Sequence, residues 1–406
     1  MKTRRFNNYL KTLIGLIFLM CSIVIVFNRL IDPFGLFWGP SIEELNTNKP
    51  LFSANQRMAK PYIIRRLEPT GIILGSSRAQ FGFDPSHPGW NGENIYNFAI
   101  PSPNLYEILR HLQHAEAVAP IDTVVLSLDF YLFNANETFN SNAPDFEETR
   151  LENSNENILL NFPIYDFIVP EAVFSLSALN ASIQTILRQK EPIRFLKNGM
   201  HDPYWNSNNI EKRGGVRFFS QEVERGFYKK NLHNYSYISN TQNTWDIYKE
   251  ILKICYLKNI NLKIITSPVH ARFLEVISTK GLWQTYNAWL RNLVSINDEM
   301  ASDLNMSQFP IWSFGYNKYT TESLPLLEDK RTEMLWYWET THFKKELGDL
   351  ILDHILNYKR ADINDQFSEP LNKDNIGEYL DMLASDRNTW RLQNSKVIDE
   401  ININLK

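Results

Sequence analysis

Cysteine is scarce in this chain of 406 residues, which contains only Cys21 and Cys255. Cys21 lies in an apolar run near the N-terminus, and Cys255 lies in a segment with helical spacing. A disulfide between them is therefore not expected, and the fold must be held together by its core. The length and the 43% of hydrophobic residues suffice for a substantial core, in one large domain or two.

An excess of basic residues is also absent. The 42 Lys and Arg are outnumbered by 46 Asp and Glu, which gives a formal net charge of −4 and a pI of about 6.1. This balance offers no general case for nucleic-acid binding, and no nucleic-acid partner is expected. His111 and His114 share a helix face without nearby cysteines or a third ligand. We expect them to be solvated, and we expect no metal and no cofactor.

Long apolar runs are absent except for one, at residues 13–27. With its flanks it approaches the roughly 20 residues that a membrane-spanning helix needs. A basic cluster precedes the run, and the first acidic residue is Asp32. Residues 1–31 are therefore predicted to form a cytoplasmic tip and a single-pass anchor, with the globular part periplasmic or at the cell surface. A cleaved signal peptide and a buried core helix are the alternatives, but no small-x-small cleavage site follows the run.

One short stretch combines a strand with a turn rich in small residues. Residues 71–74 are mostly branched and apolar, as in a buried parallel strand, and Gly75, Ser76 and Ser77 follow directly. A serine at such a strand end lies beside the first amides of a helix, which can stabilise an oxyanion. Serine is also a favoured helix N-cap, and from this stretch alone the cap is the preferred interpretation.

Apolar segments and amphipathic segments alternate along much of the chain. This alternation predicts an α/β fold with a parallel sheet covered on both faces. The predicted strands are 71–74, 94–99, 124–128, 262–266 and 310–314, and the predicted helices are 105–112, 245–255, 283–300 and 344–358.

The remaining segments lack this rhythm. Residues 134–240 are polar and rich in Asn, with a helix near 170–189, and are predicted to be an insertion over the edge of the sheet. Such an insertion is either a lid or substrate wall, or structural padding. Residues 32–69 are interpreted as a stalk, 70–358 as the α/β domain, and 359–406 as a polar tail on its surface, with a short helix near 376–383.

A carboxylate and a histidine occur far from the serine turn in sequence but at an equivalent place in the predicted fold. Glu339-x-x-His342 follows the last predicted strand and precedes the final helix of the α/β domain. In an open α/β sheet, this place and Ser77 both lie at the carboxyl edge, where ligands bind. A serine needs a base, and a histidine needs a carboxylate to fix its tautomer. The alternative is a solvated turn that caps the final helix.

The two blocks, Gly75-Ser76-Ser77 and Glu339-Thr340-Thr341-His342, resemble those of the SGNH (GDSL-like) hydrolase superfamily. With Asp84 and His87-Pro88 behind an N-terminal anchor, the chain is most similar to its membrane-anchored branch. That branch includes the D-alanine transfer protein of the teichoic-acid system and the alginate-type O-acetyltransferases. The resemblance implies a flavodoxin-like three-layer parallel sheet, with Ser77 as nucleophile, His342 as base and Glu339 as its orienting carboxylate.

The resemblance also indicates where an oxyanion would be held. The family's oxyanion glycine falls near Ser102, and its oxyanion asparagine falls near Tyr131, so neither residue type is kept. The amide of Ser77 and the side chain of Arg78 are the candidate substitutes.

Four other residues are candidates for the site by their place near strand ends. His270 is a candidate substrate contact, and Arg272 could hold an anionic or sugar group or form a surface salt bridge. Asp129 could position the nucleophile loop or cap the next turn. Asp84-x-x-His87 is the second choice for the carboxylate and histidine pair.

Two functions from different classes follow from these observations. The first is an extracytoplasmic acyl esterase or O-acyltransferase acting on a cell-envelope or exported polysaccharide, with a membrane-bound acyl-donor protein as a further expected partner. The second is a catalytically silent SGNH scaffold that binds envelope glycans or assembly partners.

Overall fold

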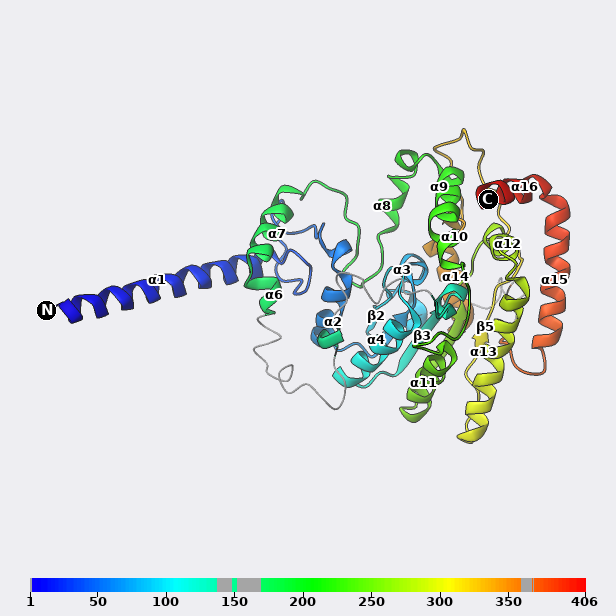
Figure 1. Ribbon diagram of the computed structural model, residues 1–406, viewed down its shortest axis with the longest axis horizontal. Coiled ribbons are helices and arrows are strands. Elements are labelled where there is room, and N and C mark those ends of the chain that lie inside the picture. The colour runs from blue at the N-terminus through cyan, green and yellow to red at the C-terminus, as the bar shows by residue number, and fades with distance from the viewer. Residues whose placement is uncertain (1, 137–147, 152–168, 359–366, 368) are drawn as a thin grey trace.

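A five-stranded parallel sheet forms the centre of the computed structural model, which describes residues 2–136, 148–151, 169–358, 367 and 369–406 (Figure 1). Its strand order is β2-β1-β3-β4-β5, and a separate antiparallel pair is formed by β6 and β7. The strands are β1 (Gly71–Leu74), β2 (Ile95–Asn97), β3 (Thr123–Leu128), β4 (Asn261–Thr266), β5 (Ile311–Trp312), β6 (Tyr337–Glu339) and β7 (His342–Phe343).

Helices surround the sheet and extend from it at the N-terminus. The α-helices are α1 (Lys2–Ile31), α2 (Gln56–Leu67), α3 (Ser77–Gly82), α4 (Leu105–Val118), α6 (Pro170–Val173), α7 (Leu176–Leu187), α8 (Pro203–Ser207), α9 (Val216–Val223), α10 (Lys229–Asn231), α11 (Thr244–Leu257), α12 (Ala271–Thr279), α13 (Trp283–Asp303), α14 (Lys345–Ile355), α15 (Ile376–Gln393) and α16 (Ser395–Asn404). The short 3₁₀-helices are η1 (Phe52–Ala54), η2 (Pro88–Trp90), η3 (Phe130–Phe133), η4 (Glu148–Arg150) and η5 (Glu211–Arg213), and η6 (Glu224–Tyr228) is a π-helix.

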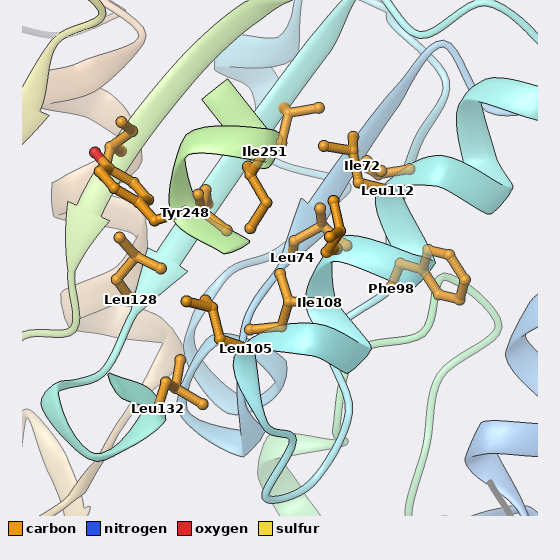
Figure 2. Packing of buried hydrophobic residues seen from close by; sticks show 14 of the residues in the cluster. Ile72, Leu74, Phe98, Leu105, Ile108, Leu112, Leu128, Leu132, Tyr248 and Ile251 are labelled. Carbon is orange, nitrogen blue, oxygen red and sulfur yellow. The ribbon is translucent and has the colours of Figure 1, made fainter. Parts of the chain in front are cut away.

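The sheet divides the hydrophobic core in two because successive side chains of a strand point to opposite faces. Ile72 and Leu74 of β1 belong to a cluster with α4, α11 and α13, and Figure 2 shows Leu74 beside Ile108 and Ile72 beside Leu112 of α4. Ile73, between them, belongs to the other cluster with α3 and α14. Each fully buried Ile or Leu contributes roughly 1.5–3 kcal/mol, so both faces are held by burial rather than by cross-links.

The predicted α/β class is confirmed, with each predicted strand and each helix of the alternating pattern present. The sheet pairs β1 in parallel with both β2 and β3. After β1 the chain continues to β2 at one edge of the sheet, and after β3 it continues to β4 on the other side. Such a switch point opens a crevice at the carboxyl ends of the strands, which is where an open α/β sheet binds ligands.

Two glycines let α3 and α14 meet backbone to backbone. A Cβ added to Gly348 of α14 would overlap the carbonyl group of Gly82 at the end of α3. A Cβ on Gly82 would in turn overlap the ring of Phe343 in β7. The two helices can therefore approach this closely only because neither contact residue has a side chain.

Residues 32–69, interpreted as a stalk that partly packs on the domain, contain a buried helix that the sequence analysis did not predict. Most of α2 is buried although it is rich in polar residues, because its side chains bond to backbone groups. Lys60 donates to the carbonyl oxygens of Asn97 (2.8 Å), Ala99 (2.6 Å) and Gly199 (3.2 Å). Polar composition concealed the helix, since the polar atoms are satisfied internally rather than by water.

The insertion and the tail also differ in detail from the prediction. The helix expected near 170–189 is split into α6 and α7, and residues 137–147 and 152–168 of the predicted insertion lie outside the described residues. In the tail, α15 continues well beyond the short helix expected at 376–383, and α16 follows it. Leu380 and Leu383 of α15 are buried, so the tail contributes to the core.

Helix α1 projects from the α/β body, beside α6 and α7 at its C-terminal end (Figure 1). Among the described residues it is the one helix long and apolar enough to cross a membrane. Its end is tied to α6 and α7 through Asn28, which donates to the carbonyl of Val173 (3.0 Å) and accepts from Ser182 (2.7 Å).

We expect Gly348→Ala to lower the free energy of unfolding by about 1–3 kcal/mol or more, because the added methyl group overpacks the contact between α3 and α14. Thermal and chemical unfolding of the detergent-solubilised chain measure the change. Gly377→Ala is the matched control, because Gly377 is also helical but has no atom within 4 Å of an added Cβ. Equal stability of Gly348→Ala and the wild type would contradict the close contact.

Candidate active site

The serine turn after β1 assigns different tasks to its two serines. Gly75 has φ +150°, and a Cβ there would lie 2.8 Å from the carbonyl oxygen of Ser127, so the turn requires glycine. Ser76 is the N-cap of α3, and its hydroxyl accepts from the amide of Arg78 (3.2 Å). The interpretation as a helix N-cap is therefore correct for Ser76. Ser77, the first residue of α3, has its hydroxyl available for another partner.

That partner is His342. Ser77 Oγ lies 2.8 Å from Nε2 of His342, although the two residues are 265 positions apart. His342 begins β7 in the β6–β7 hairpin, two residues before the N-cap of α14. The other ring nitrogen, Nδ1, is hydrogen-bonded to Oε1 of Glu339, the last residue of β6. The hairpin turn therefore presents the carboxylate and the ring together to the serine.

Glu339 is buried and surrounded by donors. Its carboxylate accepts from the amides of Thr341 and His342 (both 3.0 Å) and from the Thr341 hydroxyl (2.6 Å). Burial acts to raise the pKa of Glu339, but the neighbouring His342 and these hydrogen bonds outweigh it and lower the pKa. An ionised Glu339 fixes the proton of His342 on Nδ1, so that Nε2 faces the Ser77 hydroxyl as an acceptor.

A cavity of about 370 Å³ opens beside these residues. One wall carries Ser77, Phe81, Trp338 and His342. The ring of Phe81 lies between His342 (centroids 4.8 Å apart) and His201 of the insertion (4.1 Å). The site is therefore a pocket lined both by Ser77 and His342 and by residues of the insertion.

Arg78 is not placed to hold an oxyanion, which corrects that expectation. Its guanidinium is buried and bonded to Asp129 and to the hydroxyl of Tyr228. The ring of Phe273 lies 4.7 Å from its Cζ. Arg78 therefore points into the protein behind Ser77, and Asp129 anchors it there.

The two positions matched to the family's oxyanion residues differ in what they offer. Ser102 has φ +45°, a left-handed conformation that glycine adopts most readily, although it does not line the cavity. Tyr131 is buried, and its side chain contacts that of Ser76 rather than the cavity. The nearby Asn97 is also engaged, since its amide donates to the carbonyls of Ala79 and Phe83 (3.0 Å each). The Ser77 amide remains the candidate donor, because the first amides of a helix lack intrahelical partners.

His270 and Arg272 do not reach the cavity, so their assignment as substrate contacts is corrected. His270 is the N-cap of α12: Nδ1 accepts from the Arg272 amide (3.1 Å), and Nε2 donates to the carbonyl of Glu322 (2.6 Å). Burial lowers the pKa of His270 to about 4. Arg272 is fully buried and pairs with Glu224 (2.5 Å) and Glu400 (3.0 Å), so it forms neither a substrate contact nor a surface salt bridge.

The other histidine candidates also bond to groups of the protein itself and do not line the cavity. His87 lies 3.3 Å from Asp353, away from Ser77, so the second choice of pair is not assembled. His111 and His114 are buried rather than solvated, and bond to the carbonyls of Glu107 (2.6 Å) and Pro61 (3.0 Å). Among the described residues, no group of three or more His, Cys, Asp and Glu is placed to hold a metal ion.

The insertion supplies cavity residues that sequence reasoning missed. Arg194, His201, Asn206, Arg213 and Phe219 line the pocket opposite Ser77. The only signal in the sequence was the length of the interruption, which predicts a wall or lid without saying which side chains face inward.

No protein-family model matches the chain, and no curated protein matches it.

We expect Arg78→Met to lower the free energy of unfolding by about 3–5 kcal/mol, because it leaves the buried carboxylate of Asp129 without its counter-charge. Adding Asp129→Leu should recover a large part of this loss, since it removes the stranded charge. Unfolding of both variants beside the wild type measures the effect. A single variant as stable as the wild type would contradict the buried pair.

Glu339→Gln should destabilise the chain most near neutral pH, by about 1–3 kcal/mol, because its NH₂ group would face donors that need an acceptor. The folded-state pKa of Glu339 lies below its ordinary value of 4.5. Its carboxylate therefore contributes stability above pH 4.5, and this contribution is lost as the pH falls through the folded-state pKa. The difference in unfolding free energy between variant and wild type should shrink accordingly when measured from pH 7 to pH 3. Glu328→Gln, at an exposed position, should show no such trend.

Proposed function

We propose that the chain is a membrane-anchored, extracytoplasmic serine acyl esterase or O-acyltransferase that acts on a cell-envelope or exported polysaccharide. The observation that carries this proposal is the hydrogen-bonded row Ser77–His342–Glu339 at the wall of a cavity. Membership of the SGNH superfamily is part of the proposal. It is supported by the two sequence blocks and by a strand order that flavodoxin-like folds share.

The first half of the proposed reaction forms an acyl-enzyme. Ser77 Oγ attacks the carbonyl carbon of an ester while its proton passes to Nε2 of His342. Glu339 stabilises the imidazolium through Nδ1. As the C–O bond of the ester breaks, the same proton moves from Nε2 to the leaving alkoxide, and the acyl group stays on Oγ.

The second half returns the enzyme to its starting state. A hydroxyl of the acceptor, or water, attacks the acyl carbon and gives its proton to Nε2 of His342. The bond between the acyl carbon and Oγ then breaks, and Nε2 returns the proton to Ser77. A polysaccharide hydroxyl as acceptor makes the protein an acyltransferase, and water makes it an esterase.

The N-terminal helix supports the proposed location. The length and composition of α1 allow one crossing of a membrane, and the basic cluster before it favours a cytoplasmic N-terminus. The catalytic domain then lies outside the cytoplasm, where envelope polysaccharides are found. A membrane-bound protein that presents the acyl group is the partner that this arrangement suggests for a transferase.

A silent scaffold that binds glycans or assembly partners is the second candidate. It is favoured because the side chains that could donate to an oxyanion already form hydrogen bonds to other groups of the protein. Arg78 pairs with Asp129, and the Asn97 amide donates to backbone carbonyls. Removal of one oxyanion donor costs about 10²–10³ in rate, so this arrangement bears directly on activity.

The full-length protein should hydrolyse a chromogenic acetyl ester and react covalently with a fluorophosphonate probe. Ser77→Ala should abolish labelling and lower kcat by at least about a thousandfold, because no other group replaces the nucleophile. Gel detection of the probe and steady-state kinetics measure both effects.

Ser295→Ala is the control, since Ser295 is exposed on α13 and does not line the cavity. Ester turnover at equal rates in Ser77→Ala and the wild type would refute the proposed enzyme. Absence of labelling and turnover in the wild type would favour the scaffold.

A further inference from the structure

Arg194 and Arg213 place two positive charges in the cavity, and the described part of the chain supplies neither with an acidic partner. Neither forms an ion pair among the described residues, and the described residues that line the cavity include no Asp or Glu. Arg194 donates instead to a neutral acceptor, Nε2 of His201 (3.3 Å). Two neighbouring cations that lack a counter-charge are unusual for partly buried groups, which are normally paired.

The pKa values of the two arginines are consistent with cations that lack a close counter-charge. Burial lowers the pKa of Arg194, and the nearby charge of Arg213 lowers it further. Burial also lowers the pKa of Arg213, although the charge of Glu339 opposes this. The Glu339 carboxylate is already bonded to His342 and Thr341, so it does not serve as a counter-ion in contact with Arg213.

Aromatic rings hold both guanidinium groups at the cavity wall. The Trp205 ring lies 4.4 Å from Cζ of Arg194 and 5.1 Å from Cζ of Arg213, and Phe219 lies 4.5 Å from the latter. A guanidinium held by a ring keeps its N–H groups for a planar or tetrahedral oxyanion.

Asn206 provides an independent indication that the cavity binds a polar ligand. Its side chain is 3% exposed and lines the cavity. Neither its Oδ1 nor its Nδ2 has a hydrogen-bond partner among the described residues. Buried amides are almost always bonded, so this side chain is poised to donate to, and accept from, a group that enters the cavity.

We propose that Arg194, Arg213 and Asn206 form a subsite for an anionic group, a carboxylate or a phosphate, on the ester that Ser77 attacks. This inference rests on the proposed function for the identity of the ligand as an ester. Since the same cavity also contains Ser77 and His342, one ligand can place its anion at the arginines and its acyl carbon at the serine. The substrate class is thus an ester that also carries a carboxylate or a phosphate group.

Binding tests the subsite without requiring catalysis. Calorimetric titration of the full-length protein compares methyl glucuronide and glycerol 3-phosphate with their neutral counterparts, methyl glucoside and glycerol. We expect the wild type to bind at least one anion more tightly than its neutral counterpart, and the preferred anion distinguishes carboxylate from phosphate. Arg194→Gln/Arg213→Gln should weaken that binding by about tenfold or more.

Arg331→Gln is the matched control because Arg331 is exposed and pairs with Glu211 at the surface. It should bind anions as the wild type does. Failure of the wild type to bind either anion, or equal binding by the double variant, would overturn the subsite.

A kinetic comparison separates this inference from the proposed function. The two esters compared are an acetylated form of the anion that the titration shows to be preferred and the acetylated form of its neutral counterpart, for example acetylated methyl glucuronide and acetylated methyl glucoside. The double variant should reduce the ratio of their kcat/KM values by about tenfold. Turnover of both esters with an unchanged ratio would reject the subsite and keep the esterase. Anion binding that depends on the arginines, without turnover of any ester, would keep the subsite and reject the esterase.

Discussion

The approach of α3 to α14 is the constraint on which the candidate site depends. Ser77 begins the first of these helices, and His342 lies just before the second, so their hydrogen bond exists only if the helix backbones meet. Gly82 and Gly348 permit that meeting, and the ring of Phe343 closes over it. The hydrogen-bonded pair of Ser77 and His342 is therefore set by helix packing on one face of the sheet, and the larger part of the core lies on the opposite face.

Charge is distributed in two layers around the serine. Behind it, the buried pair of Arg78 and Asp129 is internally neutral and fixes the start of α3. In front of it, the carboxylate of Glu339 is bonded to the ring of His342, while Arg194 and Arg213 form no ion pair with a carboxylate among the described residues. The polar network is therefore satisfied behind Ser77, whereas the cavity carries cations without a counter-charge in that part of the chain, as a site for an anionic ligand requires.

The sequence specified the scaffold and the reactive row better than it specified the walls. Strands such as 71–74 and 124–128 were visible because a parallel sheet buries both faces and leaves a continuous apolar run. Ser77, Glu339 and His342 were visible because they adjoin such strands or the final helix of the domain. Arg194, Asn206 and Arg213 follow no period, and His270 and Arg272 were misplaced because a strand end does not reveal whether the next side chain turns inward. The helix of Lys60 was missed because its polar atoms find backbone partners that only the tertiary structure supplies.

The buried ammonium group of Lys60 has a mechanical consequence for the cavity. It bridges Asn97, the last residue of β2, and Ala99 to Gly199, which lies in the sequence between the cavity residues Phe195 and His201. Swinging that segment outward would break the hydrogen bond from Lys60 to Gly199 together with two backbone bonds, from Asn97 to Asn198 and from His201 to Gln80 (2.9 Å each). The pocket is therefore preformed rather than closed by movement of this segment, and a ligand is selected by whether it fits the existing shape.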